Sequence, residues 1–109
     1  MSKVVHCKRD AYDMYIGRGR GSIWGNPYSH KQGTQAKFKV DTVEEAIECY
    51  RRWLWRQIKS GEITLEQLAA LDGKVLGCWC APGRCHGEVL VVASLWARQQ
   101  LDKRDALAS

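Results

Sequence analysis

Apolar side chains recur every three or four positions along two long stretches of the chain. This spacing brings them onto one face of a helix, so it predicts amphipathic helices over residues 43–58 and 86–102. The first helix begins after a capping box formed by Thr42 and Glu45, and it ends at Gly61. The apolar positions are Val43, Ala46, Ile47, Tyr50, Trp53, Leu54 and Ile58 in the first helix and Val89, Leu90, Ala93, Trp96 and Ala97 in the second.

Shorter patterns fill the rest of the chain. A second capping box, Thr64 with Gln67, predicts a brief helix over residues 64–71. Apolar runs of strand length cover residues 4–7, 14–16 and 74–80. Four glycines fall within residues 17–25, and because no regular element tolerates that many, a loop is predicted from there through Val40.

The predicted order of elements is strand, strand, long loop, helix, helix, strand, helix. That order favours an α/β fold, in which a single compact domain over residues 1–102 has a small sheet covered by about three helices. Residues 103–109 are expected to form a frayed tail. The chain has 109 residues, of which 45% are hydrophobic and 27% charged, so it is large enough for an ordinary core and has the composition of a folded protein.

Charge and cysteine content bear on partners and location. The 17 basic residues exceed the 12 acidic ones and give a net charge of +5, which favours polyanionic partners such as nucleotides, RNA or DNA. Because we find neither a signal-peptide pattern nor an apolar run of membrane length, we expect a cytoplasmic protein with no membrane partner. The odd number of cysteines, five, fits reduced thiols better than a complete set of disulfides.

Three of the cysteines and one histidine gather where the last strand meets the last helix. The two-residue period of a strand places Cys78 and Cys80 on one face. A turn at Pro82-Gly83 then brings Cys85 and His86 to the N-terminus of the helix. Unpaired backbone N–H groups at that end stabilise a thiolate or a bound anion. This segment is therefore the first candidate site, and we refer to residues 78–87 as the Cys-His turn.

Three interpretations of the Cys-His turn stay open. In the first, Cys85 and His86 contact or act on a ligand, Arg84 helps to bind it, and Glu88 is a general acid or base. In the second, a complete tetrahedral set holds zinc, although this spacing is not a common zinc pattern. In the third, the cysteines are small core residues and the histidine caps the helix. The ligands of the zinc interpretation are Cys78, Cys80, Cys85 and His86.

The glycine-rich loop, residues 17–26, is the second candidate and is called the Gly-Arg loop below. Its backbone N–H groups can form an anion-binding nest, and its arginines can hold a phosphate by charge-assisted hydrogen bonds. The loop matches neither a P-loop nor the dinucleotide fingerprint. We predict a nucleotide-contacting loop, with a purely structural cluster of turns as the alternative. The predicted ligand-binding residues are Gly17, Arg18, Gly19, Arg20, Ser22, Trp24, Gly25 and Asn26.

Together these motifs resemble the DUF4326 family, a small domain of unknown function found in bacteriophages and bacteria. The resemblance covers about Val4 to Ala93. It implies a shared strand–turn–helix site and a phage or mobile-element setting, hence the host cytoplasm, and it implies no reaction. It rests on Tyr15-Ile16-Gly17-Arg18-Gly19, on Ser22-x-Trp24-Gly25-Asn26-Pro27, on Glu44-Glu45-Ala46 with Tyr50, and on Lys74-Val75-Leu76-Gly77-Cys78-Trp79-Cys80 followed by Pro82, Cys85-His86-Gly87, Val89 and Leu90. Relatives usually carry a single Arg-Gly, so either Arg18 or Arg20 holds the family position.

We expect the Gly-Arg loop and the Cys-His turn to meet at one cleft, although they lie far apart in the sequence. That cleft would bind or act on a phosphate-bearing nucleotide, a nucleoside derivative or nucleic acid. The alternative is a non-catalytic, zinc- or thiol-containing module that binds nucleic acid or a host protein through a basic face. The sequence does not decide between them, nor whether the protein is an enzyme.

Overall fold

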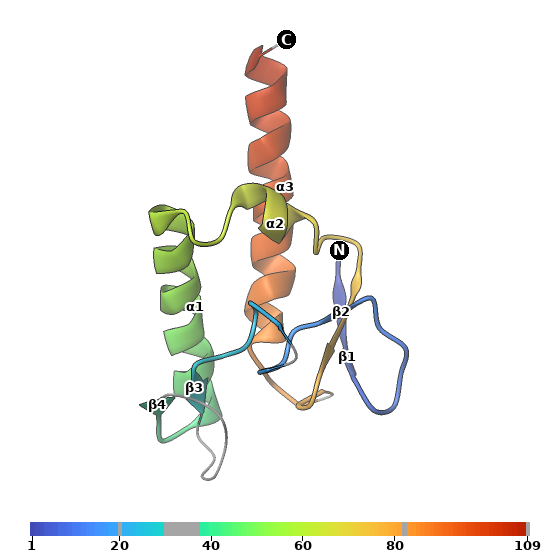
Figure 1. Ribbon diagram of the computed structural model, residues 1–109, viewed down its shortest axis with the longest axis vertical. Helices are drawn as coiled ribbons and strands as arrows, with labels where there is room; N and C mark the ends of the chain where they lie inside the picture. Colours follow the sequence, from blue (N-terminus) through green and yellow to red (C-terminus); the bar gives the residue numbers. More distant parts are fainter. Residues whose placement is uncertain (20, 30–37, 82, 109) are drawn as a thin grey trace.

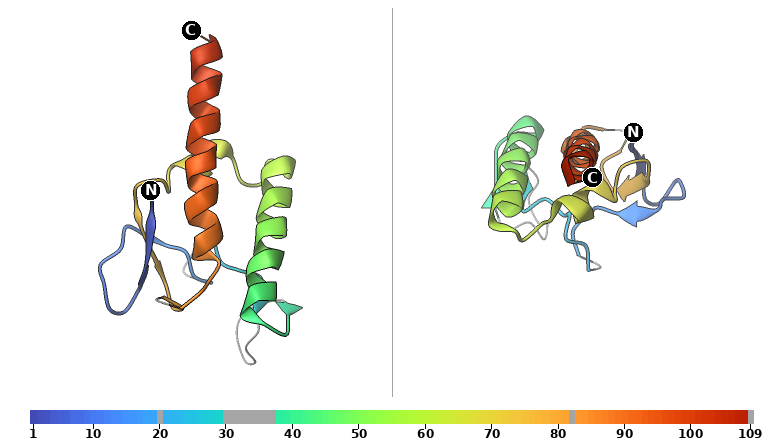
Figure 2. Two further views of the ribbon diagram at one scale, coloured as in Figure 1. Left: turned by 180° about the vertical axis from the view of Figure 1, so that it is seen from behind. Right: turned by 90° about the horizontal axis from the view of Figure 1, so that it is seen from above.

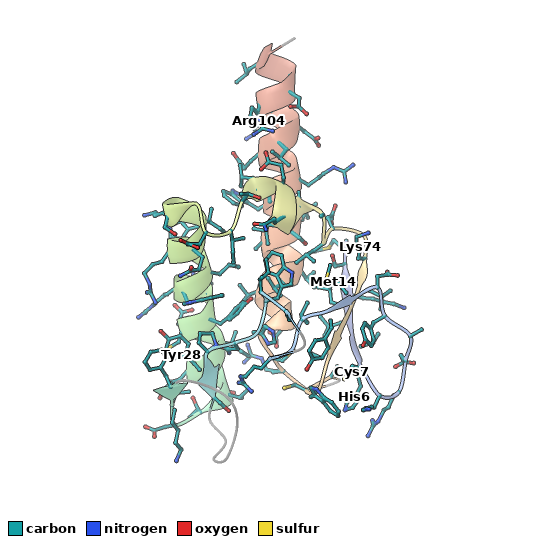
Figure 3. All side chains as sticks on the ribbon, in the orientation of Figure 1. His6, Cys7, Met14, Tyr28, Lys74 and Arg104 are labelled. Atoms are coloured by element: carbon teal, nitrogen blue, oxygen red, sulfur yellow. The ribbon has the colours of Figure 1, made fainter. Side chains whose placement is uncertain are left out.

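The computed structural model describes residues 1–19, 21–29, 38–81 and 83–108. Its central sheet contains three short strands, β1 (Lys3–His6), β2 (Met14–Tyr15) and β5 (Val75–Cys78), in the order β1-β5-β2. Both outer strands run parallel to β5. All three therefore end at the same edge of the sheet, and Figure 3 shows Lys74 at one end of the sheet and His6 and Cys7 at the other.

The central strand, β5, has residues that suit a strand covered on both faces of the sheet. Leu76, Gly77 and Cys78 are all buried. A Cβ atom on Gly77 would lie 2.6 Å from the ring of Tyr12, so glycine lets the ring pack directly against the backbone of the strand. This close approach fixes the segment that leads into β2.

Three helices complete the fold: α1 (Val43–Ser60), α2 (Leu65–Ala69) and α3 (Gly87–Ala108). In Figures 1 and 2, α3 stands between α1 and the sheet and projects beyond the rest of the molecule. The predicted α/β class is thus confirmed, with two small sheets and three helices in the described residues. The core joins side chains from the sheet, the loop before α1 and all three helices, among them Ile16, Tyr50, Leu54, Leu68, Leu76 and Leu90.

Local sequence explains where the first two helices begin and end. The Thr42 side chain accepts a hydrogen bond from the Glu45 backbone at the start of α1. Gly61 ends α1 with a φ of 85°, a left-handed conformation that glycine adopts without strain. The capping box of Thr64 and Gln67 is present at the start of α2. The predicted capping box is thus confirmed at α2, and at α1 the Thr42 half of the predicted box is confirmed.

Two predictions about the elements are wrong. The segment before Val40 is not loop throughout, because β3 (Tyr28–Ser29) and β4 (Phe38–Lys39) pair in parallel. Strands of two residues are too short to show a periodic pattern. The last helix does not fade near Asp102 but continues to Ala108. Arg104 accounts for part of this extension, because its Nη1 lies 2.9 Å from Oε1 of Glu66 and links the end of α3 to α2.

No helix in the described part of the chain is long and apolar enough to cross a membrane.

Candidate functional site

The candidate site lies at the edge of the sheet where the three strands end. Chain direction brings the end of β2 and the Gly-Arg loop beside the end of β5 and the Cys-His turn. Such edges of parallel sheets are the usual binding positions in α/β proteins. A Cβ atom on Gly87 would lie 2.8 Å from Val4 Cγ2, so glycine lets the first turn of α3 pack closely against β1.

A cleft of about 250 Å³ opens at this edge. Its walls come from the Gly-Arg loop, from β3, from the first half of α1 and from the Cys-His turn. The expectation that the loop and the turn share one cleft is confirmed by this geometry. The described lining residues are Gly17, Arg18, Asn26, Tyr28, Ser29, Val43, Ala46, Ile47, Cys78, Trp79, Cys80, Arg84, Cys85 and His86.

Arg18 is half-buried in the wall of the cleft and holds the loop together. Its Nε donates to the carbonyl of Asn26 at 2.5 Å, and its Nη2 donates to the carbonyl of Tyr28 at 3.1 Å. Burial lowers the pKa of the guanidinium, while nearby Cys80 and Tyr15 oppose that shift. An arginine remains charged after a modest shift, so the cleft contains a partly desolvated cation. Among the described residues, Nη1 has no hydrogen-bond partner.

Several other predicted loop residues have structural contacts. Asn26 lines the cleft but is only 5% exposed; its Nδ2 donates to the Ala46 carbonyl at 3.1 Å, and its Oδ1 accepts from the Tyr28 N–H at 2.9 Å. Its amide therefore fastens the loop to α1. Trp24 is buried in the core, where its carbonyl accepts from the Tyr50 hydroxyl at 2.8 Å. The structure does not bring the Trp24 ring to the cleft as a stacking surface.

Glycine is required at several positions of the loop, for a different structural reason at each. A Cβ atom on Gly17 would overlap the Tyr15 hydroxyl, and one on Gly25 would lie 2.9 Å from the Arg18 Cα. Gly19 has a φ of 77°. Gly19, Ser22 and Gly25 line a second hollow of about 370 Å³, together with Arg18, Asn26, Pro27, Phe38 and Trp53. Arg20, a predicted phosphate ligand, lies outside the described residues.

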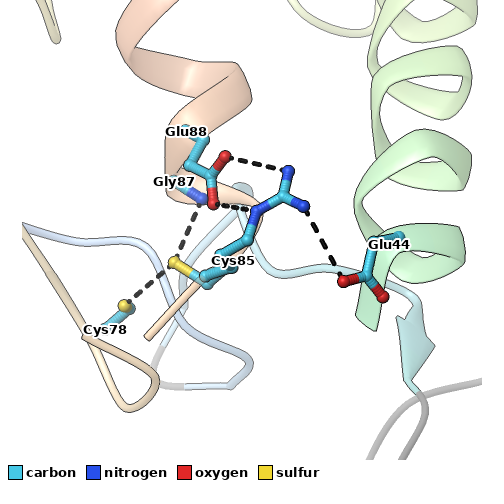
Figure 4. Close-up of polar contacts among 6 residues, drawn as sticks. Glu44, Cys78, Cys85, Gly87 and Glu88 are labelled. Carbon is cyan, nitrogen blue, oxygen red and sulfur yellow. Dashed lines mark hydrogen bonds and ion pairs between the residues drawn. The ribbon is translucent and has the colours of Figure 1, made fainter. Parts of the chain in front are cut away.

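Three thiols of the Cys-His turn gather in the cleft wall. The Sγ atoms of Cys78 and Cys85 lie 3.3 Å apart, and the Gly87 N–H donates to the Cys85 Sγ at 3.3 Å (Figure 4). Hydrogen bonds with the thiols of Cys78 and Cys80, followed by burial, raise the pKa of Cys85, and the Gly87 N–H only partly offsets this. The helix N-terminus therefore does not make Cys85 a ready thiolate, contrary to the expectation from its position.

The imidazole of His86 is engaged by the backbone at the end of β2. Its Nε2 lies 2.7 Å from the Ile16 carbonyl, and its ring packs edge-on against Tyr50 with centroids 4.8 Å apart. Burial lowers the pKa of the imidazole, so the neutral form predominates at neutral pH and Nε2–H is the donor to Ile16. The histidine thus ties the start of α3 to the end of β2. No group of three His, Cys, Asp or Glu side chains suited to a metal ion occurs in the described ranges, so the four-ligand zinc set does not form there.

Arg84 and Glu88 form a bridge between two helices. Arg84 Nε lies 3.2 Å from Glu88 Oε2, and its Nη1 lies 3.8 Å from Glu44 Oε1 on α1 (Figure 4). Arg84 lines the cleft, as predicted for a ligand-binding residue, but Glu88 lines a different cavity. The structure therefore does not bring Glu88 together with Cys85 as an acid or base.

Trp79 is the cleft residue that the sequence analysis missed. It is 48% exposed, and its Nε1 donates to the Tyr15 hydroxyl at 2.9 Å. The His6 ring packs edge-on against it at 5.8 Å, and Lys8 Nζ lies 5.5 Å from its ring centroid. The available signal was strand alternation, which places Trp79 on the face opposite to Cys78 and Cys80. Tyr28 also lines the cleft, and Figure 3 shows it beside the lower end of α1.

A larger cavity of about 690 Å³ lies between α1 and α3. Its lining is mainly apolar, and its polar members, Arg51, Arg52 and Glu88, sit in ion pairs with neighbouring side chains. It brings together no thiol or imidazole in the described residues. We take the smaller cleft as the candidate site because convergent polar groups, and not volume, distinguish a site for chemistry.

Comparison with known proteins finds a family of unknown function and a similar phage protein. The profile of the DUF4326 family, a domain of unknown function, matches residues 3–95. An uncharacterized 12.4 kDa protein from the nrdA-td intergenic region of Enterobacteria phage T4 is 37% identical over 90 residues, which cover 83% of this chain and 74% of that protein. No solved structure matches. The family match extends from β1 into α3, so it includes both walls of the cleft.

Proposed function

The chain belongs to the DUF4326 family, a domain of unknown function, and we propose that its cleft binds a phosphate-bearing mononucleotide. The observation that carries this proposal is the pairing of two features in one small cleft, an exposed tryptophan and a partly desolvated arginine. Nucleotides require both an aromatic or apolar surface for the base and a cation for the phosphate.

Trp79 is the surface on which the base stacks. Its ring is nearly half exposed and is fixed in orientation by the hydrogen bond to Tyr15 and by the edge-on contact with His6. A ring that is already held in place loses little entropy when a base stacks on it. Stacking on an aromatic side chain contributes about 1–3 kcal/mol per base.

Arg18 and Arg84 supply the charge for the phosphate. Burial of Arg18 strengthens its attraction for an anion, because less water screens the charge. Arg84 is exposed, and its ion pairs with Glu88 and Glu44 can rearrange toward a phosphate at small cost. The net charge of +5 also favours the approach of an anion.

The size of the cleft favours a mononucleotide over longer nucleic acid. Its volume of about 250 Å³ is just below the range of about 300–1,000 Å³ that small-molecule sites occupy. A duplex would need a long basic surface, whereas two of the basic side chains of α1, Arg51 and Arg52, are paired with Glu48. The proposal is one of binding, and it assigns no bond-breaking step to the cleft.

The test is a thermal-shift screen followed by calorimetry on the full chain. We expect nucleoside monophosphates or cyclic nucleotides to raise the melting temperature more than the parent nucleoside, ribose 5-phosphate or inorganic phosphate do. Each partial compound lacks one of the two features that the cleft recognises. If no phosphate-bearing nucleotide stabilises the protein, the proposal is wrong.

Matched variants locate the binding. Trp79→Ala should weaken nucleotide binding by about 5- to 150-fold, whereas Trp55→Ala, which removes a tryptophan of similar exposure (46%) from the other cavity, should leave it unchanged. Arg84→Ala should weaken the binding of monophosphates but not of nucleosides. Arg98→Ala is its control, since the two arginine side chains are 56% and 58% exposed and each is held in ion pairs. Equal effects in a variant and its control would contradict the proposed location.

A further inference from the structure

The thiols of the Cys-His turn form a cluster that nucleotide binding does not use. Cys78 ends β5, Cys80 lies in the turn and Cys85 precedes α3, so the fold brings them together from the two sides of the turn. The Cys78 and Cys85 sulfurs lie 3.3 Å apart, and the Cys80 thiol interacts with both. All three line the cleft.

The three thiols differ in access. Cys80 is exposed, whereas Cys78 and Cys85 are 1% and 5% exposed. Hydrogen bonding to Cys80 is the main reason that the pKa of Cys78 is raised, and hydrogen bonding to Cys78 and Cys80 is the main reason for the raised pKa of Cys85. In the reduced protein both buried thiols are therefore protonated and can donate to the sulfur of Cys80.

We propose that this cluster is a thiol–disulfide exchange site, in which Cys80 attacks a small disulfide and Cys85 resolves the mixed disulfide that results. Thiol–disulfide exchange needs an accessible attacking thiol, and Cys80 is exposed; a second thiol nearby, here Cys85, can then displace the bound sulfur. The inference does not depend on the proposed nucleotide binding.

The reaction balances as a two-electron exchange. The Cys80 thiol loses its proton to solvent, and its thiolate attacks one sulfur of the small disulfide. A bond forms between that sulfur and Cys80 Sγ, the substrate S–S bond breaks, and a small thiolate leaves and takes a proton. Cys85 then loses its proton and attacks Cys80 Sγ, which forms the Cys80–Cys85 disulfide and releases the second small thiol. Two cysteine thiols are oxidised and one substrate disulfide is reduced. Two molecules of a small thiol, such as reduced glutathione, reverse the reaction.

Neighbouring groups support both steps. The positive charge of Arg18 lies close enough to Cys80 to interact electrostatically with it, which favours the attacking thiolate. The Gly87 N–H, at the start of α3, points at Cys85 Sγ from 3.3 Å and stabilises the charge that develops there in the second step. Cys78 remains a donor to the cluster throughout.

The test treats the reduced full chain with oxidised glutathione and follows the products by mass spectrometry. After the wild-type protein is quenched with an alkylating reagent, we expect it to carry no glutathione and to have lost two hydrogens. Trypsin cuts after Lys74, Arg84 and Arg98, so Cys80 and Cys85 fall in separate peptides that the new disulfide joins. The Cys78→Ser variant, in which Cys80 is the remaining cysteine of peptide 75–84, should still give the joined pair.

Variants separate the two roles. Cys85→Ser and Cys85→Ala should each trap one glutathione on Cys80. Cys80→Ser should react at least tenfold more slowly. Cys49→Ser, on α1, is the matched control and should behave as the wild type. Far-ultraviolet circular dichroism confirms that each variant is folded, and having two replacements of Cys85 keeps the test decisive if one of them unfolds.

Three results would overturn the inference: glutathione spread over Cys7 and Cys49, a wild-type mixed disulfide that is not resolved, or a Cys80→Ser variant that reacts at the wild-type rate. The assay contains no nucleotide, so its outcome is separate from that of the binding screen.

Discussion

Trp79 donates its indole N–H to the Tyr15 hydroxyl at 2.9 Å, and that hydroxyl donates to the Arg18 carbonyl at 3.2 Å. The two bonds join the end of β5 to the Gly-Arg loop through the end of β2. One phenol thus sets the positions of both proposed recognition elements, the stacking ring and the loop that contains the cation.

The first prediction tests this link with Tyr15→Phe. The variant keeps the ring and removes one acceptor and one donor, so unfolding free energy should fall by about 0.5–1.5 kcal/mol for each hydrogen bond lost. Urea denaturation measures this change. Nucleotide affinity should fall as well, because the Trp79 ring loses its fixed orientation. Tyr12→Phe removes a hydroxyl from the neighbouring ring and serves as the control; an affinity loss of the same size in both variants would show that the link is unimportant.

The second prediction concerns the stability of the fold at acidic pH. Burial lowers the pKa of His86 in the folded state below its value in the unfolded chain, so on acidification the unfolded state takes up the proton first. The stability that neutral His86 contributes to the folded state is fully present above the unfolded-state pKa of about 6.5. It is lost as the pH falls below that value toward the folded-state pKa.

His86→Gln can still donate to the Ile16 carbonyl but does not titrate. Its unfolding free energy should therefore depend less on pH between about 7 and 5 than that of the wild type. The slope of unfolding free energy against pH should be smaller by the uptake of at most one proton. Denaturant titrations at several pH values provide the measurement, with His6→Gln at the end of β1 as the control. A slope unchanged from that of the wild type would mean that His86 does not couple folding to protons.

The third prediction separates the two hydrogen bonds of Asn26. In Asn26→Asp the side chain still accepts from the Tyr28 N–H but no longer donates to the Ala46 carbonyl. Because the position is buried, we expect a loss of about 1–3 kcal/mol of unfolding free energy. Asn26→Ala should lose at least as much. Thermal melts of both variants test this, and a wild-type melting temperature for either would rule out the fastening role.

The fourth prediction addresses the end of α3. Arg104→Ala removes the contact with Glu66, and Figure 3 shows Arg104 high on α3, beyond the sheet. Since the pair is exposed, the global melting temperature should hardly change, but amide exchange over residues 103–108 should become about two- to fivefold faster. Lys103→Ala is the neighbouring control. Equal exchange rates in the two variants would show that the ion pair does not hold this end.

Elements with strong local signals could be predicted from the sequence. Thr42 with Glu45 and Thr64 with Gln67 fix where two helices begin, and both caps are present in the structure. The strands β3 and β4 could not be found, because two residues show no period and their pairing joins separate segments. The length of α3 was underestimated because the Arg104–Glu66 contact crosses between helices.

The site could be predicted as a meeting of two segments, but the orientation of each side chain could not. Motif position placed Asn26 and His86 at the cleft, yet their polar atoms bond to the backbone at Ala46 and Ile16. Neither partner is close in the chain, so no local pattern reveals the bond. Trp79 was overlooked because the sequence pattern assigned it to a buried strand, whereas that strand ends at Cys78.

Arg84 connects two of the cavities described above: its own side chain lines the 250 Å³ cleft, and its ion-pair partner Glu88 lines the 690 Å³ cavity. An anion that draws the guanidinium toward itself leaves the carboxylates of Glu88 and Glu44 uncompensated. Binding of the proposed nucleotide in the smaller cleft would therefore make the Glu88 side of the larger, apolar cavity more negative.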